Sequence, residues 1–161
     1  MTTLAPSTAE AVRSAGGWLF DQVLAGWDVT VVTADHGDPR PLHILGVRAR
    51  DLDSILVMPV LGPCLQAIAV HTDLYDADER VRRMVLTAAE AGAADVRLWG
   101  GGSWPAGFDG GADPVSHRLS LAARAFKAQA MAAASLPAEP AVEIEVFRRA
   151  DIRRPGLVSA R

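Results

Sequence analysis

The 161-residue chain has one cysteine, Cys64, one lysine, Lys127, and no asparagine. A single cysteine excludes an intramolecular disulfide and a thiolate metal cluster, and we expect Cys64 to be a small buried side chain. Alanine is abundant and arginine replaces lysine almost throughout. This bias is typical of a GC-rich genome, as in actinobacteria. The arginines therefore do not by themselves indicate a binding site.

Long apolar runs and an excess of positive charge are also missing. No stretch reaches the 18 apolar residues of a membrane span, because prolines interrupt the longest candidate, residues 55–70. The net charge of −3 provides no positive field for nucleic acid. The first six residues lack the basic and apolar segments of a secretory signal. These features predict a cytoplasmic protein without a membrane or nucleic-acid partner.

Size and composition favour one folded unit. Half of the residues are apolar and 22% are charged, which is enough apolar material for a core and too much for a disordered chain. We expect a single α/β domain over residues 1–147. The remaining residues, 148–161, carry five arginines and predict a flexible C-terminal tail.

Local patterns in the first third of the chain predict a helix and two strands. Ser7 and Glu10 match a capping box, and apolar residues at helical spacing follow it, so we expect a helix over residues 8–25. The β-branched segment 28–33 and the segment 42–47 predict strands. The connection between them is short for a parallel crossover, which favours antiparallel pairing.

The rest of the chain alternates between the two patterns. The elements expected are a short helix at 50–56, a strand at 65–71, a helix at 77–91, a strand at 95–99, a helix at 114–135 and a strand at 141–147. In the last strand, Val142, Ile144 and Val146 alternate with Glu143, Glu145 and Phe147. This order predicts an α/β layered sandwich, with a mixed, mostly parallel sheet of about five strands and helices on both faces.

Residues 99–111 form the most informative segment. Six of these thirteen residues are glycine, yet two are tryptophan and one is phenylalanine. Glycines let a backbone approach a ligand closely, whereas large aromatic side chains would serve no purpose in a plain spacer. The segment therefore predicts a binding surface. Its candidate residues are Trp99, Gly100, Gly101, Gly102, Ser103, Trp104 and Phe108.

The first functional interpretation is a non-catalytic binding or regulatory module. The aromatic side chains of loop 99–111 would then anchor a protein partner or a second copy of the chain. This interpretation requires no cofactor.

The alternative is a small-molecule sensor, or a small hydrolase-like or transferase-like enzyme, with its site at the C-terminal edge of the sheet. His71, Asp73 and Ser103 are candidate catalytic residues, as base, orienting acid and hydroxyl group. Ser103 is followed by Trp-Pro and so is not in the Gly-x-Ser-x-Gly turn of a nucleophile elbow. For that reason the sequence favours the first interpretation.

Two further patterns do not support a site. Gly100 to Ser103 lack the Lys-Ser/Thr ending and the adjoining helix start of a phosphate-binding loop. His36 and His43 lie near Asp35 and Asp38, but no His-x-x-x-His spacing or cysteine pair accompanies them. We therefore predict no metal site.

Overall fold

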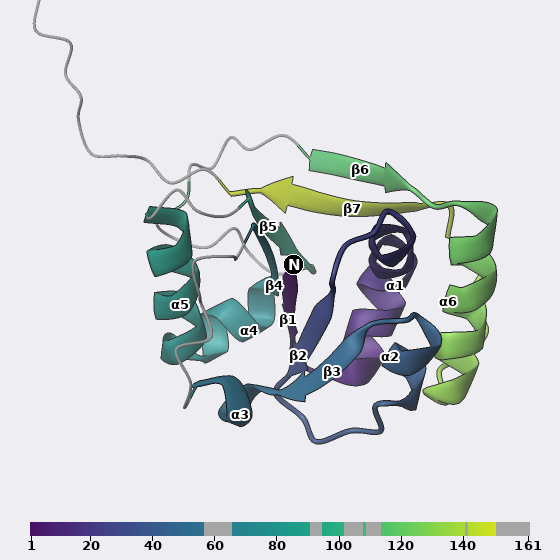
Figure 1. Ribbon diagram of the computed structural model, residues 1–161, viewed down its shortest axis with the longest axis horizontal. Helices are drawn as coiled ribbons and strands as arrows, with labels where there is room; N and C mark the ends of the chain where they lie inside the picture. The colour runs from purple at the N-terminus through teal and green to yellow at the C-terminus, as the bar shows by residue number, and fades with distance from the viewer. Residues whose placement is uncertain (57–65, 91–94, 102–107, 109–113, 141, 151–161) are drawn as a thin grey trace, which may run out of the picture.

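The computed structural model describes the chain except for residues 57–65, 91–94, 102–107, 109–113, 141 and 151–161. Its strands are β1 (Thr2–Ala5), β2 (Thr30–Thr33), β3 (Arg48–Asp51), β4 (Ala67–His71), β5 (Asp95–Trp99), β6 (Pro114–Arg118) and β7 (Ile144–Arg149). Its helices are α1 (Thr8–Leu24), α2 (Arg40–Ile44), α3 (Leu52–Leu56), α4 (Thr72–Ala77), α5 (Glu79–Glu90) and α6 (Leu121–Ala133). The predicted α/β fold with a mixed, mostly parallel sheet is confirmed (Figure 1).

The strands are ordered β3-β2-β1-β4-β5-β7-β6, and the first five are parallel. Strand β7 is antiparallel to both β5 and β6. From β1 the chain moves outward to β2 and β3, and then returns to the other side of β1 with β4. The strand order therefore reverses between β1 and β4. Open α/β sheets bind ligands at this point, beyond the carboxyl ends of the strands.

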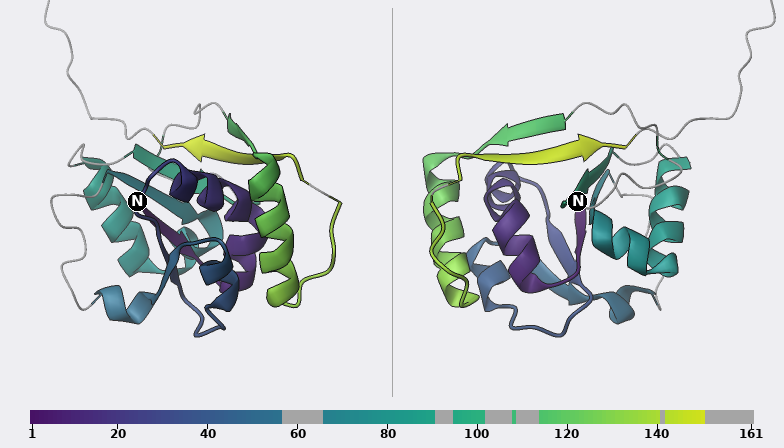
Figure 2. Two further views of the ribbon diagram at one scale, coloured as in Figure 1. Left: turned by 45° about the vertical axis from the view of Figure 1, so that its right-hand side comes forward. Right: turned by 180° about the vertical axis from the view of Figure 1, so that it is seen from behind.

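Helices cover both faces of the sheet (Figure 2). Side chains of α1, α2 and α6 pack with one set of strand residues, which includes Ala5, Ala69 and Trp99. Side chains of α3, α4 and α5 pack with the alternate set, which includes Leu4 and Val70. This alternation is the period of two expected of strands that are buried on both faces. None of the described helices has the length and apolar character needed to cross a bilayer.

The first correction concerns segment 42–47, where an antiparallel strand was predicted. The chain instead forms α2, with Pro41 in its first turn, and Gly46 at φ +75° follows the helix. Leu42 and Leu45 are both buried, and their spacing of three suits a helix. Because α2 carries the crossover, β3 pairs parallel with β2. The antiparallel assignment was wrong.

Other boundaries also differ from the prediction. The helix expected at 114–135 is divided into strand β6 and helix α6, and Ser120 caps α6 by accepting from the Ala123 amide at 3.0 Å. Strand β1 was not predicted, and β7 begins later than expected and includes Arg148 and Arg149. The helix predicted at 8–25 is confirmed as α1, with Ser7 as its N-cap.

Asp21 joins α1 to the turn between β6 and α6. Its carboxylate lies 2.8 Å from His117 Nε2, and it accepts from the Ser120 hydroxyl at 2.6 Å and from the Ser120 amide at 3.1 Å. Burial alone would raise the pKa of Asp21, but the hydrogen bonds from Ser120 and His117 outweigh it and lower the pKa. The carboxylate form is therefore stabilised in the folded state.

We expect Asp21→Asn to lower the free energy of unfolding by about 1–3 kcal/mol at neutral pH. A lowered pKa contributes stability above the ordinary value of 3.8, and that contribution is lost as the pH falls through the pKa of the folded state. The difference between wild type and variant should therefore shrink in acid. Urea unfolding at neutral and acidic pH measures it, and an equal difference at both would contradict the assignment.

Candidate functional site

Three parallel strands end close together where the strand order reverses. Strand β1 ends at Ala5, β4 ends at His71 and β5 ends at Trp99, and His71 and Trp99 are paired in register. Helix α1 begins directly after β1, and the Ser7 hydroxyl accepts from the Glu10 amide at 3.1 Å. This cap places the first turn of α1, and with it the Glu10 side chain, at the same edge.

Glu10 and His71 face each other across this edge. Glu10 Oε1 lies 3.6 Å from His71 Nε2, and the His71 side chain is 5% exposed. Glu10 also accepts from the Ser14 hydroxyl and from Arg13 Nη1 at 3.2 Å. The carboxylate is thus held by neighbours on its own helix while it faces the imidazole.

The His71 ring is fixed from two sides. Its Nδ1 accepts from the Asp73 amide at 3.1 Å, and its edge meets the Trp99 ring with centroids 4.6 Å apart and planes at 88°. A nitrogen that accepts a hydrogen bond carries a lone pair, so the neutral ring holds its proton on Nε2. The N–H of Nε2 therefore points at the Glu10 side.

The backbone of Gly100 lies close beside this ring. Its φ of +108° lies in the region that favours glycine, and an added Cβ would lie 2.6 Å from His71 Nε2 and 2.9 Å from Thr72 Oγ1. Among the described residues, an added Cβ at the adjacent Gly101 would meet nothing within 4 Å. The backbone of Gly100 can approach the imidazole only because this residue has no side chain.

The structure brings together some of the residues predicted for a site. His71, Trp99 and Gly100 are adjacent, whereas the Asp73 carboxylate is exposed, with its Oδ2 3.9 Å from Nδ1. It is the backbone amide of Asp73 that orients the ring. Ser103, Gly102 and Trp104 lie outside the described residues.

Sequence reasoning missed Glu10 and Ser14 as site residues. Glu10 was interpreted only as half of a capping box, because β1 was not recognised and nothing placed α1 at the edge of the sheet. The relevant signal is the short segment 2–5 directly before the cap, which supplies β1.

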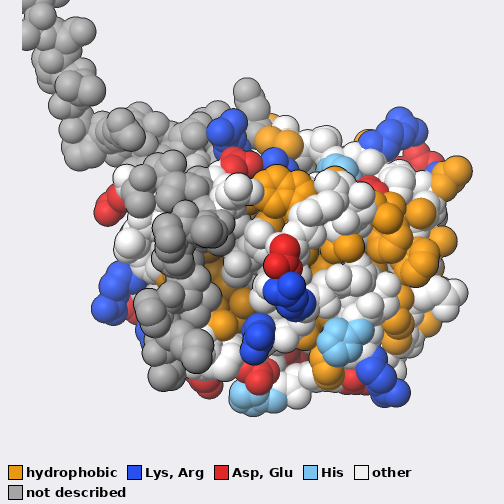
Figure 3. All heavy atoms as spheres, in the orientation of Figure 1, with side chains coloured by type: hydrophobic (Ala, Val, Ile, Leu, Met, Phe, Trp, Pro, Cys, Tyr) orange, Lys and Arg blue, Asp and Glu red, His pale blue; other side chains and the backbone are white. Residues whose placement is uncertain are grey.

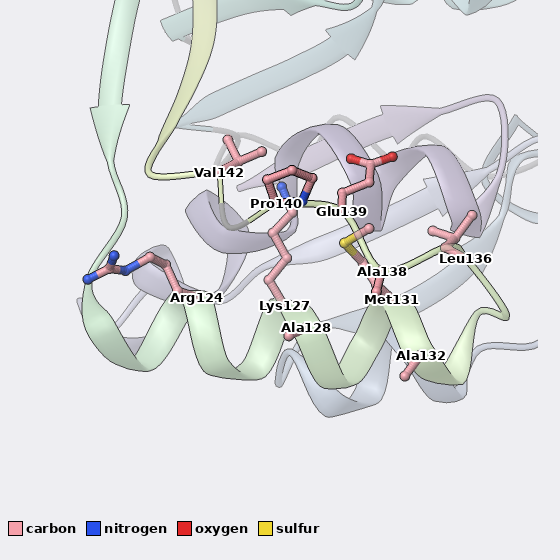
Figure 4. Close-up of a pocket in the computed structure, with 10 residues that line it drawn as sticks. All are labelled: Arg124, Lys127, Ala128, Met131, Ala132, Leu136, Ala138, Glu139, Pro140 and Val142. Atoms are coloured by element: carbon pink, nitrogen blue, oxygen red, sulfur yellow. The ribbon is translucent and has the colours of Figure 1, made fainter.

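The described residues also line hollows away from the Glu10–His71 pair, and a wide one lies between α2 and Ala133 at the end of α6. A second, of about 270 Å³, lies beyond β2 and β3 and is lined by residues such as Thr33, His36 and Asp51. Another, of about 180 Å³, lies between α6 and the segment that follows it, with Met131 and Leu136 in its largely apolar lining (Figure 4). Hydrophobic side chains also gather on the surface over α6 (Figure 3).

No protein-family model matches the sequence, and no curated protein matches it. Solved structures do match. A deacetylase–teicoplanin complex from teicoplanin biosynthesis is 16% identical and matches over 96% of this chain and 99% of its own, with a TM-score of 0.68. The zinc-inhibited form of teicoplanin deacetylase is 14% identical with the same coverage and a TM-score of 0.69. The chain has the fold of these deacetylases.

A third similar structure is the deacetylase of the antimicrobial A40926 pseudoaglycone. It is 17% identical over 92% of this chain and 96% of its own, with a TM-score of 0.61. Identities this low establish the fold alone. The match nevertheless extends over almost the whole length of enzymes that are hydrolases.

The prediction of a non-catalytic association module is therefore wrong, and the fold match favours the alternative of a small hydrolase-like enzyme. Two of the aromatic rings expected to anchor a partner also lie in the interior. Trp99 is 3% exposed and Phe108 is 7% exposed, packed against His71 and Tyr75 respectively. Rings buried in this way present no surface to a macromolecule.

One of the similar structures is named for inhibition by zinc, which raises the question of a metal. Over the described part of the chain, no three His, Cys, Asp or Glu residues are placed to hold an ion. Among the described residues of the candidate site, Glu10 and His71 supply two potential donors. His36 and Asp51, 3.3 Å apart beyond β2 and β3, form a second, exposed pair. These residues do not fit a metal centre.

Proposed function

We propose that this protein is a hydrolase that removes an acetyl group from a small molecule. The observation that carries the proposal is the approach of the Glu10 carboxylate to within 3.6 Å of His71 Nε2 where the strand order reverses. The fold match to deacetylases supports it. In one of those structures the bound molecule is teicoplanin, which suggests a small-molecule substrate and not a protein.

In the proposed reaction, Glu10 is the base and His71 is the hydrogen-bond donor. Glu10 takes a proton from water while the water oxygen forms a bond to the acetyl carbon. The carbonyl oxygen becomes negative and accepts from His71 Nε2–H, as in an oxyanion hole. The bond from the acetyl carbon to the leaving nitrogen or oxygen then breaks, and Glu10 returns its proton to the leaving group. The products are acetic acid, which loses its proton to become acetate, and a free amine or alcohol.

Glu10→Gln should lower kcat/KM about 10²–10⁴-fold, because glutamine keeps the shape of the side chain and cannot accept the proton. Acetate release from a panel of N-acetyl and O-acetyl compounds, followed by proton NMR, measures the rate. The matched control is Glu79→Gln, since Glu79 pairs with Arg82 on α5 at the same spacing of three as Glu10 with Arg13.

The control variant should hydrolyse the substrate at the wild-type rate. If the wild type releases acetate from none of the compounds, or if both variants lose activity equally, the proposed function is contradicted.

A further inference from the structure

We infer that His71 acts as a fixed Nε2–H donor that binds an oxygen acceptor of the substrate, and that the site does not hold a transition metal through this residue. This inference deepens the proposed function, because it names the role of one member of the pair and the chemical class of group that binds there. It rests on the direction of one hydrogen bond and on the donors available around Nε2.

The first observation is the hydrogen bond that His71 Nδ1, the ring nitrogen other than Nε2, accepts. His71 is the N-cap of α4, with extended backbone angles of φ −71° and ψ 132°, and its Nδ1 accepts from the Asp73 amide. Donor and acceptor are two residues apart, so the local backbone sets this contact. A backbone amide can only donate, and Nδ1 must therefore carry the lone pair.

A histidine that binds a metal has the opposite arrangement. It coordinates through the lone pair of one nitrogen and donates the N–H of the other to a carboxylate, a carbonyl or water. If His71 Nε2 bound an ion, the proton would have to move to Nδ1, where it would face the N–H of Asp73. Two donors would then point at each other inside the fold. The capped conformation of His71 thus opposes coordination through Nε2.

The second observation concerns the other groups around Nε2. Glu10 Oε1 lies 3.6 Å away, beyond hydrogen-bond distance, and no hydrogen bond of the described residues uses Nε2. The Gly100 backbone lies on another side, and the Trp99 ring meets the imidazole. A zinc site needs three or four protein donors, and Glu10 is the one further carboxylate within 4 Å of Nε2 among these residues.

What fits Nε2–H is an oxygen with a lone pair. The carbonyl oxygen of an acetyl group meets that requirement, and so does either oxygen of a carboxylate. Acetate therefore serves as a probe of the site, because it has the acceptor oxygens of the substrate and is also the product of the proposed reaction.

The direct test is the protonation state of the ring. Nitrogen-15 NMR on the neutral ring distinguishes a nitrogen with a proton from one with a lone pair. We expect Nδ1 of His71 to be the unprotonated nitrogen and Nε2 to carry the proton. The reverse assignment would overturn the inference. Sodium acetate should shift the Nε2 signal, and a titration that leaves the signal unchanged would also overturn it.

A calorimetric titration with zinc chloride tests the metal separately. His71→Asn keeps an acceptor that can cap α4 and removes the imidazole. We expect the two proteins to give the same zinc isotherm. A stoichiometric site that is present in the wild type and lost in the variant would refute the inference.

None of these readouts requires turnover. If the ring has the expected protonation state but acetate is never released, the proposed function fails while the inference stands. If acetate is released and depends on a zinc ion bound through His71, the inference fails while the proposed function stands.

Discussion

Replacing Glu145 with alanine should lower the free energy of unfolding by about 3–5 kcal/mol, the typical cost of removing one partner of a buried ion pair. The Glu145 carboxylate accepts from Lys127 Nζ at 2.6 Å and from the α1 amides of Gly17 at 3.0 Å and Trp18 at 2.7 Å. Glu145 is 3% exposed and Lys127 is 5% exposed. The variant would leave the Lys127 ammonium group buried without its carboxylate partner, and the Gly17 and Trp18 amides without the Glu145 oxygens that accept from them.

The expected loss of unfolding free energy is large because the substitution leaves a buried charge without its partner. A buried ion pair often adds little net stability, because removing both charges from water costs about as much as their attraction returns. An unpaired buried charge has no such compensation. Glu145 also connects β7 to both α1 and α6, so its loss affects three elements at once.

Glu143→Ala is the matched control, two residues earlier in the chain. Glu143 pairs with Arg118 and Arg124 at 3.2 Å each, but its side chain is 54% exposed, and such pairs are worth about 0–1 kcal/mol. Urea unfolding followed by circular dichroism compares the two variants. Equal losses would show that the buried contacts of Glu145 do not have the role assigned to them.

Strand β7 also shows where sequence reasoning was insufficient. The alternation of Val142, Ile144 and Val146 with Glu143, Glu145 and Phe147 was recognised, but it did not reveal which face would be buried. All three apolar side chains are exposed, and it is Glu145 and Phe147 that point inward. A hydrophobicity pattern predicts that the apolar face of a strand is the buried one. The partners that make Glu145 acceptable in the core come from α1 and α6, more than a hundred and about eighteen residues away in the chain.

The fold class could be predicted because it depends on the alternation of long local patterns, and α1 and α5 show such patterns clearly. The misassigned elements are short. Strand β1 has four residues and α2 has five, so β1 spans only two periods of a strand pattern and α2 little more than one helical turn. In β6, Pro114 was interpreted as the first residue of a helix because a proline suits both positions.

The site was predicted only in part, because the sequence shows local patterns and the site also depends on contacts between distant segments. His71 could be named because it ends a clear strand, β4, and ligands bind beyond such ends. Its partner Glu10 lies 61 positions earlier, and the contact depends on the parallel pairing of β1 with β4. No local pattern reports that pairing.

Gly100→Ala should remove hydrolysis and lower the free energy of unfolding by about 2–6 kcal/mol. A side chain at φ +108° is strained by about 1–3 kcal/mol, and a new methyl group in a packed site costs about 1–3 kcal/mol more. The new Cβ would lie 2.6 Å from His71 Nε2. The imidazole cannot move away freely, because its Nδ1 bond to Asp73 and its edge contact with Trp99 hold it.

Gly101→Ala separates this effect from a general loss of glycine flexibility. An added Cβ there meets none of the described residues within 4 Å, so the variant should keep wild-type stability and most of its activity. Urea unfolding and the acetate-release assay apply to both variants, and the His71 nitrogen-15 signals should shift in Gly100→Ala alone. If both variants behave like the wild type, the Gly100 backbone does not hold the His71 ring, and the donor at Nε2 would have to be positioned by the Asp73 amide and Trp99 alone.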